Sequence, residues 1–476
     1  MTHLQKKTAR TLAALLVTAV LAGGWPMAGK AGAEASTSTS TSVPVAGKVT
    51  EVRTSSEAIS DWKAWAKDHA YRLETIQPAG PGQTANYDDL QMLKPLLQDK
   101  RIVFLGESSH GVGEFNSVKT RLIQFLHDEM GYNVLAFESG LSNTALGYGK
   151  AGAASAEETM KSSIFGVWWS KEILPLFDYI KSSARTEKPL VLTGFDMQLQ
   201  YPLIEGDWLQ DATLAKKLKE AEEKLSDYSA SADIKAYQKD KSRLISVYKE
   251  VLKSLNTEKV QAKLKELYPT NPKLPILLER SLNDRIRVAE EYVELSIQSN
   301  VDMATGDYTA FLKTMEWRDQ AMLNNLLWLA NEVYPQEKFI VWGHNDHIRK
   351  AQSKVIGSPY PIKLMGEMLP DELKKYSYVL GLYASSGKTA DNTGAEHEVL
   401  PLEPGSVESI LSAEGAPYTF IDLRYRQNER GSSWMFEPRQ TYSWGMIPES
   451  LIARDQYDGL LLIDNVHPPQ YLRNKK

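Results

Sequence analysis

The fold is decided by the segment Ile102-Val103-Phe104-Leu105-Gly106-Glu107-Ser108-Ser109-His110-Gly111. Its first four residues are apolar and partly β-branched, which is typical of a short buried strand. An acid and a histidine follow the strand closely, and glycines bracket them. This order predicts a strand of a parallel sheet with polar side chains at its carboxyl end, where α/β proteins bind their ligands.

Six further runs have the composition of buried strands. They cover residues 134–137, 190–192, 339–342, 377–382, 419–423 and 460–463. Amphipathic helical stretches separate most of them, for example residues 114–129 and 172–182. Because strands that alternate with helices form parallel sheets, we expect an α/β fold with a mostly parallel sheet flanked by helices.

Residues 209–299 differ from the rest of the chain and are rich in Lys, Glu, Ala and Leu. Apolar residues recur there at intervals of three and four, which predicts helices. Pro269, Pro272 and Pro275 interrupt any heptad pattern, so a hairpin or small bundle is favoured over a long coiled coil. We interpret this section as an inserted helical subdomain that forms one wall or lid of a substrate cleft.

The first 33 residues have the order of a secretory signal peptide. Lys6, Lys7 and Arg10 precede an apolar stretch over residues 11–27, and Ala31-Gly32-Ala33 supplies a cleavage site. An uncut membrane anchor is the alternative, which the glycines and proline near the end of the stretch disfavour. Residues 34–50 are a Ser/Thr-rich linker and 51–476 the α/β domain, so we expect a secreted protein without a membrane segment after cleavage.

Composition restricts the chemistry that the chain can use. It has no cysteine, which excludes disulfides, thiolate metal sites and cysteine nucleophiles. The net charge is −5 over 476 residues with acids and bases interspersed, so the basic surface typical of nucleic-acid binding is missing. With 42% hydrophobic residues, the chain is long and apolar enough for a large core.

Polar residues follow three of the other predicted strands. Glu138 ends the second strand, Asp196 lies in the turn after the third, and His344 and His347 follow the fourth. Parallel strands end at the same edge of their sheet, so we expect these residues to share a cleft with the acid and histidine of the first strand. A single acid at a strand end is more often a helix cap or loop former, and Asp196 is open to that interpretation.

A histidine with a pKa near 6.5 can take a proton from water at neutral pH. A neighbouring carboxylate can fix the tautomer of such a histidine and stabilise its imidazolium, and the spacing of Glu107 and His110 fits this pairing if the segment turns. His344 and His347 are three residues apart, so one helical turn can direct both into the cleft.

Several other residues have two interpretations each. Ser108 and Ser109 lack the G-x-S-x-G context of a nucleophilic serine, and they can cap the following helix instead. Arg318, in a predicted helix, is either a surface ion-pair partner or a clamp for a carboxylate or an oxyanion. Of Trp168 and Trp169, we expect one in the core and the other in an apolar wall for a bulky substrate.

Several separated motifs resemble the erythromycin esterase family. They are Gly-Glu-x-x-His-Gly-x-x-Glu-Phe at 106–115, Glu138, Trp168-Trp169 with Glu172, Gly-x-Asp-Met-Gln at 194–198, Arg-Asp-x-x-Met at 318–322, Trp-x-His-Asn-x-His at 342–347 and Tyr-Asp-Gly-Leu at 457–460. The resemblance extends from about residue 89 to residue 468. It implies hydrolysis of an ester or lactone, such as that of a macrolide antibiotic, and a response to antibiotics.

The resemblance also implies roles for individual residues. By position it implies that His110 is the general base for water, supported by Glu107, and that the other catalytic residues are Glu138, His344, His347 and Arg318. The expected substrate-binding residues are Lys119, Trp168, Trp169 and Asp196. Lys119 stands where the family often has Arg, which weakens a bidentate contact. The expected secretion signal is a second difference, because the antibiotic-resistance members of the family act inside the cell. This difference concerns the identity of the substrate more than the type of reaction.

Two other functions remain open. Three histidines and several carboxylates suit zinc or manganese, so a metal-dependent hydrolase is one alternative. A secreted binding protein without turnover is the other, and the intact Glu107 and His110 disfavour it. Our expectation is a hydrolase of a small-molecule ester or lactone that uses His-activated water, without a metal or another cofactor.

Overall fold

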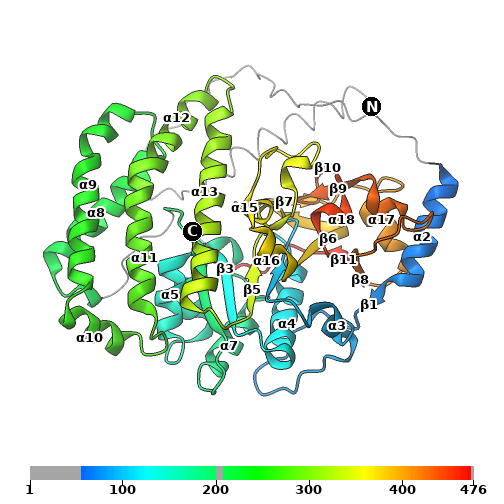
Figure 1. Ribbon diagram of the computed structural model, residues 1–476, viewed down its shortest axis with the longest axis horizontal. Coiled ribbons are helices and arrows are strands. Elements are labelled where there is room, and N and C mark those ends of the chain that lie inside the picture. The colour runs from blue at the N-terminus through cyan, green and yellow to red at the C-terminus, as the bar shows by residue number, and fades with distance from the viewer. Residues whose placement is uncertain (1–54, 200–206, 473–476) are drawn as a thin grey trace.

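The computed structural model describes residues 55–199 and 207–472 (Figure 1). The predicted signal peptide and linker, residues 1–50, lie outside the described residues. Within the described residues, no helix has the length and apolar character needed to cross a membrane.

A mostly parallel sheet forms the centre of the molecule, which confirms the predicted fold class. Its strand order is β4 (Val191–Asp196), β3 (Val134–Gly140), β5 (Phe339–Trp342), β2 (Ile102–Leu105), β6 (Ser377–Ala390), β11 (Gly459–Val466), β8 (Tyr418–Asp422) and β1 (Tyr71–Arg72). The strands from β4 to β11 are parallel, whereas β8 is antiparallel to β11. The short strand β7 (Glu396–Glu398) pairs with the far end of β6.

Helices cover both faces of the sheet, so β2, β3 and β5 are buried along their whole length. Side chains of β2 alternate between two apolar cores: Val103 and Leu105 pack into one core, and Ile102 and Phe104 pack into the other. Helices at the first core are α4 (Gly113–Met130) and α7 (Leu174–Ser183), and helices at the second are α5 (Leu141–Lys150) and α13 (Thr309–Trp328).

The register of the central strands places their carboxyl ends at one level. Leu105 of β2 and Phe137 of β3 both pair with Trp342 of β5. Residues that follow these positions therefore leave the sheet side by side, whatever their separation in sequence.

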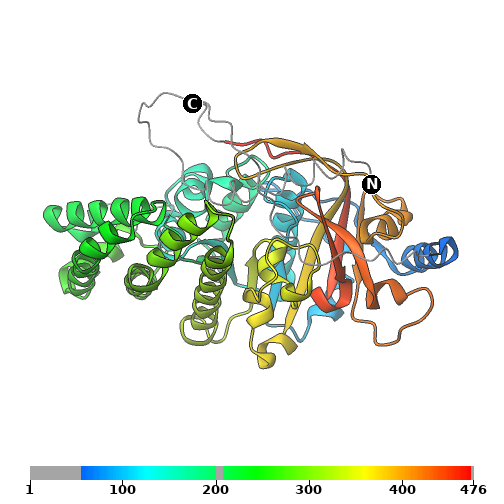
Figure 2. The same cartoon turned by 90° about the horizontal axis from the view of Figure 1, so that it is seen from above.

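From residue 207 onward, the described chain between β4 and β5 is mostly helical. Its helices are α8 (Ala212–Ser229), α9 (Ile234–Leu255), α10 (Glu258–Leu267), α11 (Leu274–Arg287), the π-helix η4 (Val288–Tyr292), α12 (Val293–Met303) and α13. Figures 1 and 2 show α8 and α9 at the end of the molecule farthest from β8 and β11, whereas α13 runs back along the sheet. The helical run thus continues beyond residue 299, and α13 packs against β4.

A separate hairpin lies beside the sheet. It consists of β9 (Pro438–Ser443) and β10 (Ile447–Ile452), paired antiparallel. The remaining helices are α2 (Ser56–His69), α3 (Leu93–Leu97), α6 (Ala156–Ser163), α14 (Asn345–Ile348), α15 (Met365–Met368), α16 (Asp371–Lys375), α17 (Val407–Leu411) and α18 (Ala453–Gln456).

Candidate active site

A buried acid and a histidine form a pair just beyond β2. Nδ1 of His110 lies 2.6 Å from Oε1 of Glu107. The Glu107 carboxylate also accepts hydrogen bonds from Nζ of Lys119 at 2.8 Å and from the indole N–H of Trp168 at 2.9 Å. Lys119 comes from α4, and its Nζ lies 3.8 Å from the centre of the Trp342 ring. Glu107 is therefore held in one orientation by three donors.

The charges of this pair follow from burial and from the neighbouring cations. Burial alone raises the pKa of Glu107, but Lys119 and His110 outweigh it and lower that pKa to about 2. Burial lowers the pKa of His110 below its ordinary 6.5, and the Glu107 carboxylate offsets only part of this effect. At neutral pH, His110 is thus a neutral imidazole whose Nδ1–H faces an ionised carboxylate.

The other ring nitrogen of His110 is available to accept a proton. Among the described residues, Nε2 of His110 has no hydrogen-bond partner, and the side chain is 12% exposed. A neutral imidazole with a fixed Nδ1–H presents a lone pair at Nε2. This is the arrangement of a general base for water.

His344 faces His110 from the end of β5. The two ring centroids are 5.0 Å apart. Nδ1 of His344 lies 3.2 Å from the backbone nitrogen of Asp346 and 3.3 Å from Oδ2 of that residue. In the neutral tautomer that accepts the backbone N–H, and in the imidazolium that donates to the carboxylate, Nε2 carries a proton. Within the described part of the chain, this buried Nε2 has no partner.

Glu138, at the end of β3, connects the remaining polar residues. Its Oε2 accepts the backbone N–H of His344 at 2.7 Å, and its Oε1 lies 3.2 Å from Nη2 of Arg318 and 3.3 Å from Nε2 of His347. Arg318, from α13, also donates to Oδ2 of Asp196 at 2.7 Å. Burial raises the pKa values of Glu138 and Asp196, but the nearby cations outweigh it and lower both.

His347 has the opposite charge preference to His110. Burial lowers its pKa, but Asp319 and Glu138 outweigh burial and the opposing effect of Arg318, and they raise the pKa to about 9. Oδ1 of Asp319 lies 2.8 Å from Nδ1 of His347. The site therefore holds a neutral histidine and a protonated histidine at the same pH, a separation typical of acid–base sites.

The sequence model of the family described as erythromycin esterase matches residues 127–466. The chain belongs to the erythromycin esterase family. The family match begins after Glu107 and His110, so the motif at 106–115 rests on the geometry of the site.

Two curated relatives match most of the chain. "Putative hydrolase YbfO" of Bacillus subtilis (strain 168) is 35% identical over 418 residues, which cover 86% of this chain and 91% of that protein. Erythromycin esterase type II of Escherichia coli is 22% identical over 390 residues, covering 76% of this chain and 89% of that protein. The family and both names indicate a hydrolase.

Two solved structures share the fold. A Bacillus cereus protein has a TM-score of 0.63 and 20% identity, covering 87% of this chain and 99% of that chain. An erythromycin esterase mutant, EreC in its open conformation, has a TM-score of 0.54 and 17% identity, covering 84% of this chain and 98% of that chain. At these identities the likeness shows the erythromycin esterase fold and nothing finer.

The structure brings the six predicted catalytic residues together. They are Glu107, His110, Glu138, Arg318, His344 and His347, and the contacts given above connect them. Arg318 lies in the site, so the interpretation as a surface ion-pair partner is wrong.

The predicted substrate-binding residues have other surroundings. Lys119 and Trp168 are buried behind Glu107 and hold its carboxylate. Asp196 is buried and accepts hydrogen bonds from Arg318 and from the N–H of Met197, so it anchors the arginine and shapes the loop. Trp169 is half-buried, and its indole N–H donates to the Ile164 carbonyl at 2.9 Å.

The serines after β2 do not cap α4. The helix begins at Gly113 after Val112, which makes no side-chain capping bond. Ser109 Oγ donates to the Ala390 carbonyl and accepts the N–H of Gly111, so it fixes the loop that carries His110.

Sequence reasoning missed three residues of the site. Asp319 holds His347, Asp346 contacts His344, and the ring of Trp444 lies against both His110 and His344. Asp319 and Asp346 stand beside predicted residues within the same motifs, which is a usable signal. Trp444 precedes Gly445 in a two-residue turn, at the position where Asn is usual, and this unusual residue is the only sequence signal that could have identified it.

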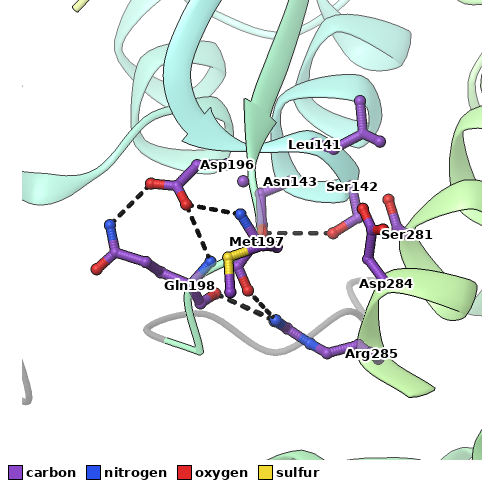
Figure 3. A pocket seen from close by; sticks show the side chains of 10 residues that line it. Leu141, Ser142, Asn143, Asp196, Met197, Gln198, Ser281, Asp284 and Arg285 are labelled. Atoms are coloured by element: carbon purple, nitrogen blue, oxygen red, sulfur yellow. Dashed lines mark hydrogen bonds between the residues drawn. The ribbon is translucent and has the colours of Figure 1, made fainter. Parts of the chain in front are cut away.

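A small pocket borders the site at Asp196 (Figure 3). Residues of β4 and its following loop, α5 and α11 line it, including Asn143, Gln198, Ser281 and Asp284. Figure 3 shows Arg285 of α11 reaching the Met197 carbonyl, a contact of 2.5 Å. The helical section therefore touches the end of β4, whereas the charged residues that it contributes to the site, Arg318 and Asp319, come from α13.

Metal binding was the main alternative raised by the sequence. Among the described residues, no group of three or more histidine, aspartate or glutamate side chains is arranged to hold a metal ion. The carboxylates of Glu107, Glu138 and Asp196 are instead paired with Lys119, His347 and Arg318.

Proposed function

We propose that this member of the erythromycin esterase family hydrolyses a carboxylic ester or lactone with water activated by His110. The observation that carries the proposal is the neutral, oriented imidazole of His110, whose Nδ1 is tied to Glu107 and whose Nε2 is free of partners among the described residues. Family membership supports the hydrolase class.

In the proposed reaction, the oxygen of a water molecule bonds to the ester carbonyl carbon while Nε2 of His110 takes a proton from that water. The carbonyl oxygen becomes an oxyanion, and a donor such as Nε2–H of His344 stabilises it. The tetrahedral intermediate then breaks its bond to the alcohol oxygen, which takes the proton back from His110. The products are a carboxylic acid and an alcohol, or a hydroxy acid from a lactone.

Glu107 supports the step by stabilising the imidazolium that forms on His110. It remains ionised because Lys119 lies 2.8 Å from its second oxygen. Arg318 and protonated His347 both contact Glu138, and the second oxygen of Glu138 accepts the backbone N–H of His344.

For the substrate, we propose a macrolide lactone as the first candidate, and the family and the Escherichia coli relative's name support it.

We also propose that the protein acts outside the cell, on the basis of the signal-peptide pattern in residues 1–33. Sequencing the N-terminus of the secreted protein tests this point, and we expect the mature chain to begin at Glu34.

The function is tested by assaying the purified protein against erythromycin, other macrolides and simple nitrophenyl esters, with and without chelator. We expect an acid product from at least one class, turnover that resists chelator, and loss of turnover in His110→Gln. Activity abolished by chelator and restored by zinc or manganese would favour the metal-dependent alternative. Tight ligand binding without any product would favour the binding protein.

The absence of a covalent intermediate is tested separately. We expect fluorophosphonate treatment to leave Ser108 and Ser109 unlabelled and turnover unchanged, because neither serine has the context of a nucleophile. A stable adduct on either serine, with parallel loss of activity, would contradict direct attack by water.

A further inference from the structure

The turn of the β9–β10 hairpin carries a tryptophan at a position that normally takes a different residue. Trp444 and Gly445 have φ values of 56° and 71°, and the N–H of Met446 donates to the Ser443 carbonyl at 3.1 Å. Two-residue hairpin turns with positive φ at both positions favour Asn-Gly or Asp-Gly. A bulky residue at positive φ is strained, so its retention points to a role for the side chain.

The Trp444 ring contacts both facing histidines of the site. Its centroid lies 5.2 Å from that of His344 with the planes 24° apart, and 5.4 Å from that of His110 with perpendicular planes. The backbone of Trp444 is also fixed, because its N–H donates to the Ser108 carbonyl at 2.7 Å and its carbonyl accepts from Thr389 Oγ1 at 2.8 Å. A stacked ring on a fixed backbone restricts rotation of the His344 ring.

The second strand of the hairpin reaches His344 through a buried chain of charges. Glu449 of β10 pairs with Arg349 at 2.7 Å, Arg349 lies 3.1 Å from Asp346, and Asp346 lies 3.3 Å from Nδ1 of His344. Arg349 also donates to the hydroxyl of Tyr457 at 2.7 Å. The hairpin thus contacts the face of the His344 ring directly and its Nδ1 edge indirectly.

We propose that the β9–β10 hairpin is the positioning element of His344, with Trp444 and Glu449 as positioning residues. Together they hold the ring so that Nε2 keeps its proton and its direction during the reaction. The inference rests on the proposed function, because it assigns His344 a role at the ester. Neither positioning residue touches the reacting atoms; both act through the imidazole.

Two substitutions of Trp444 distinguish the effect of its aromatic ring from the effect of its backbone conformation. Gly adopts the observed φ without strain, so Trp444→Gly should fold while losing the ring contact. We expect a loss of about 10²-fold in kcat with KM nearly unchanged, since a small misplacement of a catalytic group has an effect of that order. Trp444→Phe retains an aromatic face and should recover most of the turnover.

Two further variants complete the set. Glu449→Gln keeps the shape of the side chain, removes the charge that holds Arg349, and should lower kcat in the same direction as Trp444→Gly. Trp434→Phe is the matched control, because Trp434 is buried in the short helix η8 (Ser433–Phe436) that packs on the same hairpin. We expect the control to lower the melting temperature without changing kcat per folded molecule.

A spectroscopic readout tests positioning without turnover. The chain has eight histidines, so ring-labelled ¹⁵N-histidine gives a small set of signals, and His344→Gln identifies the one from His344. We expect a single Nε2-protonated tautomer in the wild type and a tautomer mixture in Trp444→Gly. If the wild type hydrolyses no ester but Trp444→Gly still converts the single His344 tautomer to a mixture, the proposed function fails while the positioning role stands.

Two results would overturn the proposal. One is a Trp444→Gly variant whose KM rises while kcat is retained, because the indole would then be a substrate contact. The other is a His344 signal that is the same in Trp444→Gly, Glu449→Gln and the wild type.

Discussion

Nδ1 of His110 lies 2.6 Å from Oε1 of Glu107, inside a site where the acid is fully buried. The contact is between a neutral imidazole and an ionised carboxylate, because Lys119 keeps Glu107 charged while burial keeps His110 neutral. Four consequences of this arrangement and of the adjoining Arg318 and His347 can be measured.

Lys119→Met should destabilise the protein strongly. It leaves the buried Glu107 carboxylate without its cation, and breaking a buried pair in this way costs about 3–5 kcal/mol. The double variant Lys119→Met/Glu107→Gln should regain part of that stability but not the activity. Denaturant unfolding of both variants measures the effect.

A surface pair provides the control for this cycle. Lys94 and Glu129 lie 2.7 Å apart with side chains 40% and 39% exposed, and breaking such a pair changes stability by about 0–1 kcal/mol. A Lys119→Met variant as stable as Lys94→Met would show that the buried pair does not hold Glu107.

The acid side of the pH profile should report His110. Because burial lowers its pKa, kcat/KM should fall only below the ordinary value of 6.5, as the imidazole becomes protonated and can no longer accept a proton. Glu107→Gln removes the contact that favours the charged form, so the remaining activity should extend to lower pH. An inflection above 6.5 in the wild type would contradict the assignment.

The alkaline side should report His347 through stability. Its pKa in the folded protein is raised to about 9 from the ordinary 6.5, so its contribution to the free energy of unfolding is fully present below pH 6.5 and is lost as the pH rises through 9. Urea unfolding of the wild type should show this decline between those values. The decline should be absent from His347→Gln, and an identical decline in that variant would assign it to another group.

Arg318→Lys should retain the fold and lose activity. Arg318 contacts Asp196 at 2.7 Å and Glu138 at 3.2 Å through one nitrogen, with a further contact at 3.4 Å from Nε to Asp196. Lysine keeps the charge but has neither the planar fork nor its fixed spacing, so kcat/KM should fall about tenfold or more. Wild-type activity in a folded Arg318→Lys variant would show that charge alone suffices.

The sequence predicts the parts of this site that depend on strand order. Glu107, Glu138 and His344 each follow a buried run, and parallel strands in register necessarily bring them together. The sequence does not predict which way each side chain points within the cluster. Lys119 sits on a helix nine residues after His110, and only packing decides that it points at Glu107 and not at a substrate.

Trp444 illustrates a second limit. Its hairpin is a separate two-stranded sheet, so no strand-end argument relates it to the main sheet. Its turn also breaks the usual turn chemistry, and such local exceptions are where sequence rules fail and functional sites occur. Asp346 and Asp319 differ from Trp444, because each lies beside a recognisable histidine or arginine of a predicted motif.

The most direct test of the account is the turnover of His110→Gln, measured as kcat/KM on the best ester or lactone under conditions where the variant is folded. A positioned general base contributes about 10²–10⁴-fold, and we predict a loss in that range with the melting temperature nearly unchanged. A folded His110→Gln variant that retains kcat/KM within about threefold of the wild type would contradict the role of His110 as the base that activates water.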